Sequence, residues 1–403
     1  MLRMRRVYHN ARLILPPHLR SGEGFLSEED GHIRSVQLRE GKSDFEDLLS
    51  LEKQLCEEEI DCQGDYLSPG LIDLHCHGAL GRDTMEATQE AFDVILNYHA
   101  TRGTTLAVLT TVAASLSEIE GVLSGAEKYQ KERKNPLFAG IHLEGPYFSP
   151  LRQGAHRQAM LRHPSPEETE VLLKYAGVIS RITLAPEIPG VIELIPILKL
   201  HGIVVSAGHS EAIHDEALAG FSAGITQVTH LYNCMSSLHS KKGRRSTGLA
   251  EAALTMPGVL CEVIADGRHL SPTLLRLAWL AKGWQEIAIV SDATAGSGLP
   301  EGASFQLGGL PCRIEQGEAL TGVGEDQRLA GSTIGMIDGV RGMVEGGKTP
   351  PEEAVAMASL VPARALNLEH SRGSLEVGKR SDLIRFTEDW QVRGVWSAGE
   401  KIV

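Results

Sequence analysis

The chain has 403 residues, of which 42% are hydrophobic, enough to build a large folded unit with a sizeable buried core. Its formal net charge of -13 argues against nucleic-acid binding, because a phosphate backbone requires a dense basic surface. An anionic small molecule is still compatible with this charge, provided that arginine, lysine and histidine side chains gather at one place.

The cysteines and the amino terminus indicate a cellular compartment. Six cysteines are scattered without a CxxC pair, which predicts reduced thiols and neither a zinc ribbon nor a disulfide framework. The amino terminus is basic, but its only apolar run is short and broken by prolines, so we expect no signal peptide. No stretch approaches the ~20 apolar residues of a membrane helix. These features predict a soluble, cytoplasmic protein.

Residues 1–67 differ from the rest of the chain and predict a β-rich unit. Short β-like runs alternate there with turn signals such as Glu29-Asp30-Gly31-His32. The charged stretch Arg39–Glu59 is expected to form an exposed loop or helix. Pro69-Gly70 ends this region, and a regular alternation begins after it.

Eight short apolar runs, separated by helix-length segments, follow. Runs rich in Ile, Val and Leu are typical of parallel strands that are buried on both faces. The runs are Leu71–His77, Thr104–Thr110, Phe138–Glu144, Ile179–Glu187, Gly202–His209, Ile225–Leu231, Leu260–Ala265 and Glu286–Asp292. Amphipathic segments between them include Glu167–Ala176, Gly190–Leu200 and Pro272–Lys282. Eight even repeats favour a (β/α)8 barrel over the alternative, a doubly wound sheet.

The carboxyl-terminal part returns to a β-rich pattern. A helix-like segment, Glu352–Leu366, precedes Gly373-Ser374-Leu375, where the second β-rich stretch opens. We therefore expect a barrel over residues 68–366. Residues 1–67 and 367–403 are expected to form one small β-sandwich together, because the two ends of a chain often lie close in space.

Side chains that can bind a metal stand at the ends of several of these runs. The active site of such a barrel lies at the carboxyl ends of its strands, so these side chains should converge. Two-residue spacing places His75 and His77 on one side of a strand. The full candidate set is His75, His77, Glu144, His209, His230 and Asp292. Imidazoles with carboxylates indicate a divalent cation, zinc or iron, with a position left for water.

Each of these residues alone has an ordinary structural explanation. A histidine beside an apolar run is more often a core or capping residue than a ligand, and an aspartate after a strand is most often a helix cap. His142, next to Glu144, is interpreted in this way, as a residue behind the ligands at most. Six such residues at equivalent strand ends make coincidence improbable, so the set predicts a metal-dependent hydrolase.

Asp292 is the candidate general base. A carboxylate near a metal-bound water can accept its proton, and the acid form can then protonate the leaving group. His269, just past the seventh run, is a candidate for polarising the scissile carbonyl or holding the oxyanion. On spacing alone, an exposed loop histidine is an equally good interpretation of His269.

Two basic segments, Arg152–Arg157 and Lys241–Arg245, follow strands that carry candidate ligands. Such charge runs are usually solvated surface. Their place on the catalytic face favours a phosphate-binding role instead, for which arginine pairs and glycine-flanked backbone amides are suited.

Short motifs around the candidates carry a family resemblance. The motifs are Pro69–Gly78 (PGLIDLHCHG), His142–Tyr147 (HLEGPY), Ala207–Ser210 (AGHS), Thr229–Asn233 (THLYN), Ile264–Gly267 (IADG), Ser291–Thr294 (SDAT) and Leu329–Ser332 (LAGS). In them the chain resembles the N-acetylglucosamine-6-phosphate deacetylases of the amidohydrolase superfamily, from about Ser68 to the carboxyl terminus. The resemblance implies a (β/α)8 barrel with a small β-sandwich from both termini, usually as a homodimer. It also implies hydrolysis of the acetamido bond of a 6-phosphorylated amino sugar.

The resemblance implies a division of the metal ligands. Glu144, His209 and His230 match the ligands of the main metal. His75 and His77 match the pair that members with a second metal use, so the resemblance implies one or two ions per subunit.

Further roles are implied for the catalytic and substrate-binding residues. Asp292 matches the catalytic acid/base, and His269 matches the carbonyl-side histidine. His156 matches a histidine that reaches the phosphate across the dimer interface, and Arg245 is similar in position to a phosphate-binding arginine. Positions that line the sugar pocket are matched by Ala155, Asn233 and Cys234.

Departures from the family pattern leave alternatives open. Asn233-Cys234-Met235 replaces the usual Asn-Ala-Met, and Gln153 stands where a lysine is common. The segment Ser237–Gly248 is longer than in some members and lacks the common Arg-Glu-Pro-Gly, so either Arg244 or Arg245 is the phosphate-binding arginine. An epimeric substrate, N-acetylgalactosamine 6-phosphate, or another N-acyl amino sugar therefore stays open.

Two other classes of protein are disfavoured. A cyclic amidase commonly carries a lysine that bridges two metals, and the run Arg181–Glu187 has no lysine at its end. A catalytically inactive barrel kept as a binding protein would typically have lost ligands, whereas all six are present here.

Overall fold

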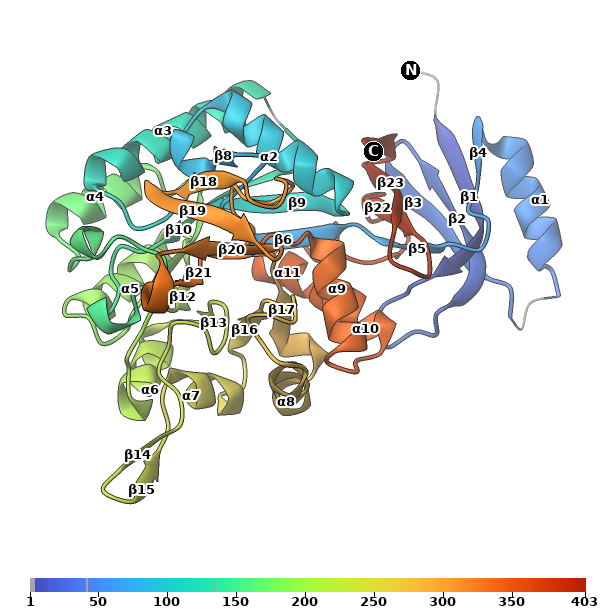
Figure 1. The fold of residues 1–403 in the computed structure, drawn as a ribbon. Coiled ribbons are helices and arrows are strands. Elements are labelled where there is room, and N and C mark those ends of the chain that lie inside the picture. The colour runs from blue at the N-terminus through green and yellow to red at the C-terminus, as the bar shows by residue number, and fades with distance from the viewer. Residues whose placement is uncertain (1–3, 41–42, 134) are drawn as a thin grey trace.

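The computed structural model describes residues 4–40, 43–133 and 135–403, and it has a barrel and a smaller β domain (Figure 1). Within these residues, eight parallel strands form the barrel, one in each of the eight predicted runs. They are β6 (Leu71–Cys76), β9 (Thr104–Thr110), β10 (Phe138–Glu144), β11 (Ile179–Leu184), β12 (Val204–Ala207), β13 (Gln227–Val228), β16 (Leu260–Val263) and β17 (Ile287–Ile289). Strands that follow one another along the chain are neighbours in the sheet, from β6 round to β17.

The two edge strands of this sheet approach each other and close the barrel. Just past β17, the backbone N–H of Asp292 donates to the carbonyl of His75 on β6 at 2.9 Å. Every residue of β6 and of β9 is buried, as expected for strands that face side chains of the barrel interior on one side and helices on the other.

Helices alternate with the barrel strands. Those that follow the first seven strands are α2 (Gln89–Thr101), α3 (Leu116–Arg133), α4 (Pro166–Lys174), α5 (Val191–Leu200), α6 (His214–Ala223), α7 (Leu249–Thr255) and α8 (Pro272–Lys282). The predicted amphipathic segments correspond to α4, α5 and α8. Side-chain oxygens of Thr88, Ser165 and Ser271 cap α2, α4 and α8 by accepting backbone N–H groups of the first turn. No helix in the described ranges is both long enough and apolar enough to span a membrane.

The predicted helix Glu352–Leu366 is two helices in the structure, α10 (Pro351–Met357) and α11 (Leu360–Ala365), which follow α9 (Met336–Glu345). The hydroxyl of Ser359 donates to the carbonyl of Val355 at 2.6 Å. A continuous helix would use that carbonyl for its backbone, so this bond accompanies the break.

Both ends of the chain build the small β domain. Its strands are β1 (Arg5–Leu13), β2 (Gly22–Glu29), β3 (His32–Leu38), β4 (Glu58–Asp61), β5 (Tyr66–Pro69), β22 (Leu383–Phe386), β23 (Val392–Ser397) and β24 (Glu400–Lys401). They are hydrogen-bonded into one sheet, in which antiparallel pairing of β5 with β22 joins the two ends. Tyr8 and Trp396 pack edge to face in its core. Within the predicted loop or helix, α1 (Phe45–Leu55) packs on the sheet through Phe45.

Three β elements on the barrel were not predicted, the smallest being the pair β7 (Gly78–Ala79) and β8 (Arg82–Asp83). An antiparallel sheet stands between β17 and α9, formed by β18 (Ser304–Leu307), β19 (Leu310–Glu315), β20 (Glu318–Thr321) and β21 (Arg328–Leu329). A hairpin of β14 (His239–Lys241) and β15 (Arg244–Ser246) projects away from the barrel, at the lower left of Figure 1. The hairpin strands are short and polar, so they give no hydrophobic periodicity. In the sheet, Phe305, Leu307, Cys312 and Ile314 alternate with polar residues on either side of Gly308-Gly309, a hairpin signal that the prediction did not use.

Candidate metal centre and active site

Glu144, His209 and His230 meet at the carboxyl end of the barrel. Glu144 is the last residue of β10, and the two histidines follow β12 and β13. Glu144 Oε1 lies 3.2 Å from His209 Nε2 and 3.0 Å from His230 Nε2, and the two Nε2 atoms are 3.0 Å apart. All three side chains are buried. The predicted main ligand set is therefore assembled around one point.

His75, His77 and Asp292 form a second group beside the first. The Nε2 atoms of the two histidines are 3.2 Å apart, and each lies 3.3 Å from Asp292 Oδ1. Glu144 Oε2 links the groups, because it lies 3.5 Å from His75 Nε2 and 3.2 Å from His77 Nε2. The structure thus brings all six predicted residues together.

Three of these residues share an uncommon backbone conformation. His209, His230 and Asp292 have positive φ angles of 49°, 32° and 50°. Side chains other than glycine rarely adopt this left-handed region, and such strain is concentrated at functional sites. At each of these positions the backbone turns sharply just after a barrel strand, while the side chain joins the site.

The donor set fits divalent cations. Within each group, one ligand atom per residue lies within 4.8 Å of the others. Burial alone lowers the pKa of His75, but the nearby carboxylates of Glu144 and Asp292 raise it well above its ordinary value. Burial alone raises the pKa of Glu144, yet the surrounding imidazoles lower it well below its ordinary value. The carboxylates thus favour protonated imidazoles, and the imidazoles favour ionised carboxylates. A bound divalent cation can take the place of the protons on these imidazoles.

A buried ion pair supports the ligands from behind. Glu262 Oε2 lies 3.4 Å from His75 Nδ1 and accepts the backbone N–H of His230 at 3.3 Å. Arg181 forms an ion pair with Glu262, and both side chains are at most 1% exposed. Sequence reasoning missed this pair, although a charged residue in the middle of an apolar strand is a signal of such a role.

His142 and Asp73 also act behind the ligands. The ring of His142 packs edge to face on that of His75, 4.7 Å away, and its Nε2 lies 2.7 Å from the hydroxyl of Thr183. Asp73 accepts the hydroxyl of Ser291 at 2.5 Å and the backbone N–H of His75 at 3.2 Å. These contacts fix the strand ends from which His75 and Asp292 project.

His156 is buried beside Glu144 at the metal-binding end of the cavity. Its side chain is 5% exposed and its Nε2 lies 3.5 Å from Glu144 Oε2, so it faces the candidate metal ligands. Its Nδ1 accepts the backbone N–H of Ala113 at 3.1 Å, which leaves the ring proton on Nε2. Burial lowers the pKa of His156 to about 4, so the ring is neutral at physiological pH. The ring therefore lines the cavity of this chain, and its contact with the phosphate stays a prediction.

His269 is buried in the wall of the pocket and is not the exposed loop histidine of the alternative interpretation. Its Nδ1 lies 2.7 Å from Asp266 Oδ2. Burial lowers the pKa of His269, but the Asp266 carboxylate more than offsets this and the pKa is raised. Asp266 therefore favours the cationic form of this histidine.

Five of the six candidate residues line a cavity of about 230 Å³: His77, Glu144, His209, His230 and Asp292. The predicted sugar-pocket residues Ala155, Asn233 and Cys234 line it, together with His156 and His269. Three of the lining residues come from the unpredicted sheet: Leu307 on β18, and Arg328 and Leu329 on β21. The motif Leu329–Ser332 had drawn attention to this strand, but nothing in the sequence placed Arg328 at the site.

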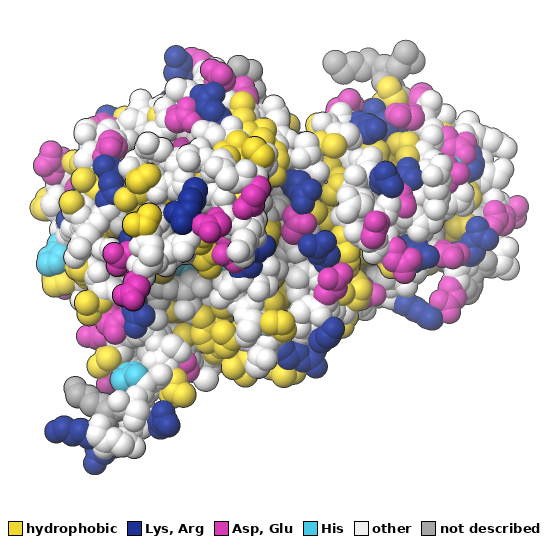
Figure 2. Space-filling model, in the orientation of Figure 1, with side chains coloured by type: hydrophobic (Ala, Val, Ile, Leu, Met, Phe, Trp, Pro, Cys, Tyr) yellow, Lys and Arg dark blue, Asp and Glu magenta, His cyan; other side chains and the backbone are white. Residues whose placement is uncertain are grey.

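The basic segments lie outside the cavity wall, except for Gly154, Ala155 and His156. Arg152 forms an ion pair with Glu211, and Arg157 lies 3.3 Å from Glu118. Arg244 and Arg245 are exposed on the projecting hairpin. Figure 2 shows Lys and Arg side chains at the tip of this hairpin, lower left, away from the body of the subunit. Neither hairpin arginine lines the cavity of this chain.

Comparison with known proteins identifies relatives over nearly the whole chain. The model of the Amidohydrolase family matches residues 66–402. An N-acetylglucosamine-6-phosphate deacetylase of Vibrio furnissii is 35% identical over 83% of this chain and 82% of its own. An N-acetylgalactosamine-6-phosphate deacetylase of Escherichia coli O157:H7 is 34% identical over 83% of this chain and 87% of its own.

A solved structure has the same fold throughout. It is a mutant N-acetyl-D-glucosamine-6-phosphate deacetylase of Mycobacterium smegmatis in complex with N-acetyl-D-glucosamine-6-phosphate. The TM-score is 0.87 and the identity 28%, with 100% of this chain and 99% of that chain covered.

Proposed function

The chain belongs to the amidohydrolase family, and we propose that it hydrolyses the acetamido bond of N-acetylglucosamine 6-phosphate to glucosamine 6-phosphate and acetate. The observation that carries the proposal is the convergence of six candidate metal-binding and acid/base side chains in two adjacent groups, and five of these side chains line one cavity. The relative from Vibrio furnissii, which has this activity in its name, supports the choice of substrate.

Glu144, His209 and His230 are proposed to hold the main ion, zinc or iron, and His75 and His77 to hold a second where one binds. The donor set of imidazoles with a carboxylate suits either metal. A divalent cation bound there supplies Lewis-acid polarisation of the acetamido carbonyl and makes water easier to deprotonate.

Asp292 is proposed to move the proton. Burial alone raises the pKa of its carboxyl, but the adjacent charges of His75 and His77 lower it to about 2, so it is ionised at neutral pH. The carboxylate accepts a proton from the attacking water. The acid form then donates that proton to the amide nitrogen as the carbon–nitrogen bond breaks, which releases the amine and acetate.

The two pocket histidines are proposed to have different tasks. Neutral His156 presents its Nε2 proton toward the metal ligands, where the acetamido carbonyl would lie, and so stabilises negative charge on that oxygen. His269, whose pKa is raised by Asp266, is better suited to the anionic part of the substrate. This exchanges the roles that the family resemblance implied for these two residues.

The projecting hairpin supports a homodimer. Arg245 lies on β15, outside the cavity of its own subunit, on an arm that extends from the barrel. We propose that this arm brings Arg245, or its neighbour Arg244, to the phosphate in the cavity of a second copy.

A mixture of Arg245→Gln and Asp292→Asn enzymes tests this, because a mixed dimer has one complete site. Acetate release above the sum of the two single variants is expected. The same mixture is prepared with Arg244→Gln in place of Arg245→Gln. If neither mixture is more active than the sum of its single variants, a phosphate site completed by the hairpin of a second copy is excluded.

The six cysteines are all free, which is consistent with a reducing compartment. We propose on this basis that the protein works in the cytoplasm.

The epimer N-acetylgalactosamine 6-phosphate is the second candidate substrate. It is favoured by the relative from Escherichia coli, which is named for that activity and is nearly as similar as the one from Vibrio furnissii. Acetate release from both sugar phosphates, measured side by side with one enzyme preparation, decides between them. A higher kcat/KM for the glucosamine compound supports the proposal, and the opposite order assigns the enzyme to the epimer.

A further inference from the structure

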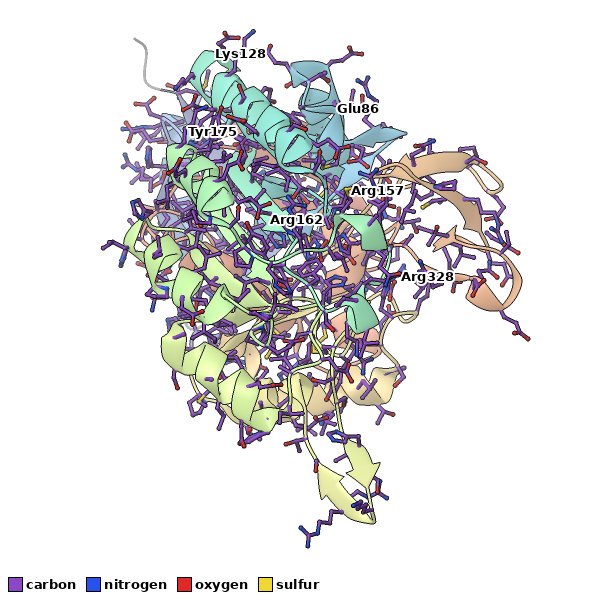
Figure 3. All side chains as sticks on the ribbon, turned by 90° about the vertical axis from the view of Figure 1, so that its left-hand side faces the viewer. Glu86, Lys128, Arg157, Arg162, Tyr175 and Arg328 are labelled. Carbon is purple, nitrogen blue, oxygen red and sulfur yellow. The ribbon has the colours of Figure 1, made fainter. Side chains whose placement is uncertain are left out.

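The sheet β18–β21 forms one wall of the cavity and carries an arginine at its edge. Arg328 begins β21, where it pairs with Thr321 of β20, and its side chain is exposed and lines the cavity. In Figure 3, Arg328 lies where this sheet meets the segment that follows β10. The Gly308 N–H donates to Asp83 Oδ2 at 3.1 Å, and this bond fastens the sheet to the barrel.

Arg328 differs in its ion pairs from two other arginines at this sheet. Arg313 lies 2.9 Å from Glu315, and Arg268, which contacts the sheet from the barrel, lies 2.7 Å from Glu318. Across the described residues, Arg328 has no side-chain hydrogen bond or ion pair with the protein. An unpaired guanidinium on a chain with a net charge of -13 can bind an anion without first breaking an internal ion pair.

The charges of the cavity divide it into two ends. Its carboxylates, Glu144 and Asp292, belong to the buried metal-binding end. Arg328 is the one Lys or Arg side chain among the residues described as lining the cavity, and it is exposed to solvent. In a 6-phosphorylated sugar, the 2-acetamido group and the phosphate are attached at opposite ends of the sugar ring. A substrate with its amide at the metal ligands therefore has its anionic end directed away from them.

We propose that Arg328 binds the phosphate of the substrate from within the same subunit and so sets the preference of this enzyme for phosphorylated sugars. The inference rests on the proposed function for the identity of the substrate. The choice of residue rests on the position of Arg328 in the cavity wall. It adds a binding residue to His269 and to the arginine of the projecting hairpin. Arg328 makes its contribution without a second subunit, so a dissociated subunit retains part of the phosphate preference.

The test compares Arg328→Gln with Arg313→Gln, a control on the same sheet that removes an arginine outside the cavity. Steady-state kinetics are measured with N-acetylglucosamine 6-phosphate and with unphosphorylated N-acetylglucosamine. For Arg328→Gln we expect KM for the phosphorylated sugar to rise about tenfold, with kcat within about twofold of the parent. The kcat/KM for the unphosphorylated sugar should stay within about twofold. Arg313→Gln should behave as the parent with both substrates.

Calorimetry with glucosamine 6-phosphate separates this inference from the proposed function, because binding of this probe does not depend on turnover. We expect its affinity to fall about tenfold in Arg328→Gln and to be unchanged in Arg313→Gln. If the parent released no acetate from the sugar phosphate, the proposed function would fail, and the affinity difference would still support the anion site. The inference would be overturned if KM and affinity were unchanged in Arg328→Gln, or if the parent did not bind glucosamine 6-phosphate. It would also be overturned if Arg328→Gln lost kcat/KM equally with both sugars, or if Arg313→Gln showed the same loss as Arg328→Gln.

Discussion

Asp292 stands where a barrel strand ends and its backbone turns into the left-handed region, with its carboxylate 3.3 Å from two imidazoles. Replacing it by asparagine keeps the shape of the side chain and removes its ability to accept a proton. We expect Asp292→Asn to lower kcat for acetate release about thousandfold, the size of effect typical of a lost general acid/base.

The control for this variant is Asp326→Asn, an exposed aspartate in the turn between β20 and β21, which should keep parental activity. Thermal melting should show that Asp292→Asn remains folded. Parental turnover by Asp292→Asn would mean that another group moves the proton.

His156 and His269 are predicted to respond differently to substitution. His156→Asn should lower kcat about a hundredfold for phosphorylated and unphosphorylated sugars alike, because both have the same acetamido carbonyl. His269→Asn should mainly raise KM for the phosphorylated sugar. Steady-state kinetics of the two variants with both sugars measure this. A uniform loss in His269→Asn, combined with a phosphate-specific loss in His156→Asn, would return the roles to those that the resemblance implied.

At the scale of single residues, the sequence predicted the side chains that stand at strand ends and missed those whose place depends on loop geometry. His75, Glu144 and Asp292 could be found because an apolar run ends beside each of them. The orientation of His156 depends on a hydrogen bond from Ala113, which no local pattern reveals. Arg328 lies 184 residues from Glu144 on a sheet whose strands are short, so its approach to the site required the structure.

The strands β11 and β16 are joined in the barrel by the buried pair of Arg181 and Glu262. Removing the arginine alone leaves a carboxylate without its counter-charge at a position 0% exposed. We expect Arg181→Met to lower the free energy of unfolding by about 3–5 kcal/mol. Urea unfolding measures this.

The double variant Arg181→Met/Glu262→Gln provides the comparison for that pair. Its glutamine retains hydrogen-bonding capacity near His75 and His230 but carries no charge, so it should regain most of the lost stability. A single Arg181→Met variant as stable as the parent would contradict this account of the pair.

Helix α2 contributes a pH dependence through His99, whose Nε2 lies 3.1 Å from the carbonyl of Gly78. Burial lowers the pKa of His99 to about 4, below its ordinary value of about 6.5. Between these values the unfolded chain binds a proton at this site and the folded chain does not, so this residue makes stability fall as pH falls. Between about pH 7 and pH 5 its contribution to the loss is about 2 kcal/mol.

Replacing His99 by glutamine should reduce the acid-induced loss of unfolding free energy by that amount, measured by urea unfolding at both pH values. His370→Gln is the matched control, because the His370 side chain is 91% exposed. A variant at position 99 with the same pH dependence as the parent would show that burial does not control this titration.

At the scale of elements, periodicity identified what is repeated and buried. Each of the eight apolar runs contains a barrel strand, because strands covered on both faces require continuous apolar sequence. The helix predicted over Glu352–Leu366 is interrupted at Ser359, whose side chain competes for a backbone carbonyl. The sheet β18–β21 carries alternating instead of continuous apolar residues, and the exposed strand β15 of the hairpin carries no apolar pattern.

For the molecule as a whole, we propose that an acidic chain binds an anionic substrate because a cationic side chain stands at the solvent-exposed end of the cavity. Most charge lies on the outer surface, whereas the cavity combines buried carboxylates at its metal-binding end with Arg328 at its wall. Such an arrangement attracts a sugar phosphate locally despite the net charge of -13. The small β domain takes strands from both termini, and its topology joins chain segments more than 300 residues apart, Ser68 with Ile384.

The central claim is that the buried ligand set makes this chain a metal-dependent deacetylase. The measurement that tests it most directly is acetate release from N-acetylglucosamine 6-phosphate by metal-stripped enzyme during titration with Zn²⁺ or Fe²⁺. We predict no release before metal is added and a plateau at one or two ions per subunit. Full activity in protein shown by mass spectrometry to contain no metal, or no activity at any metal loading, would contradict the claim.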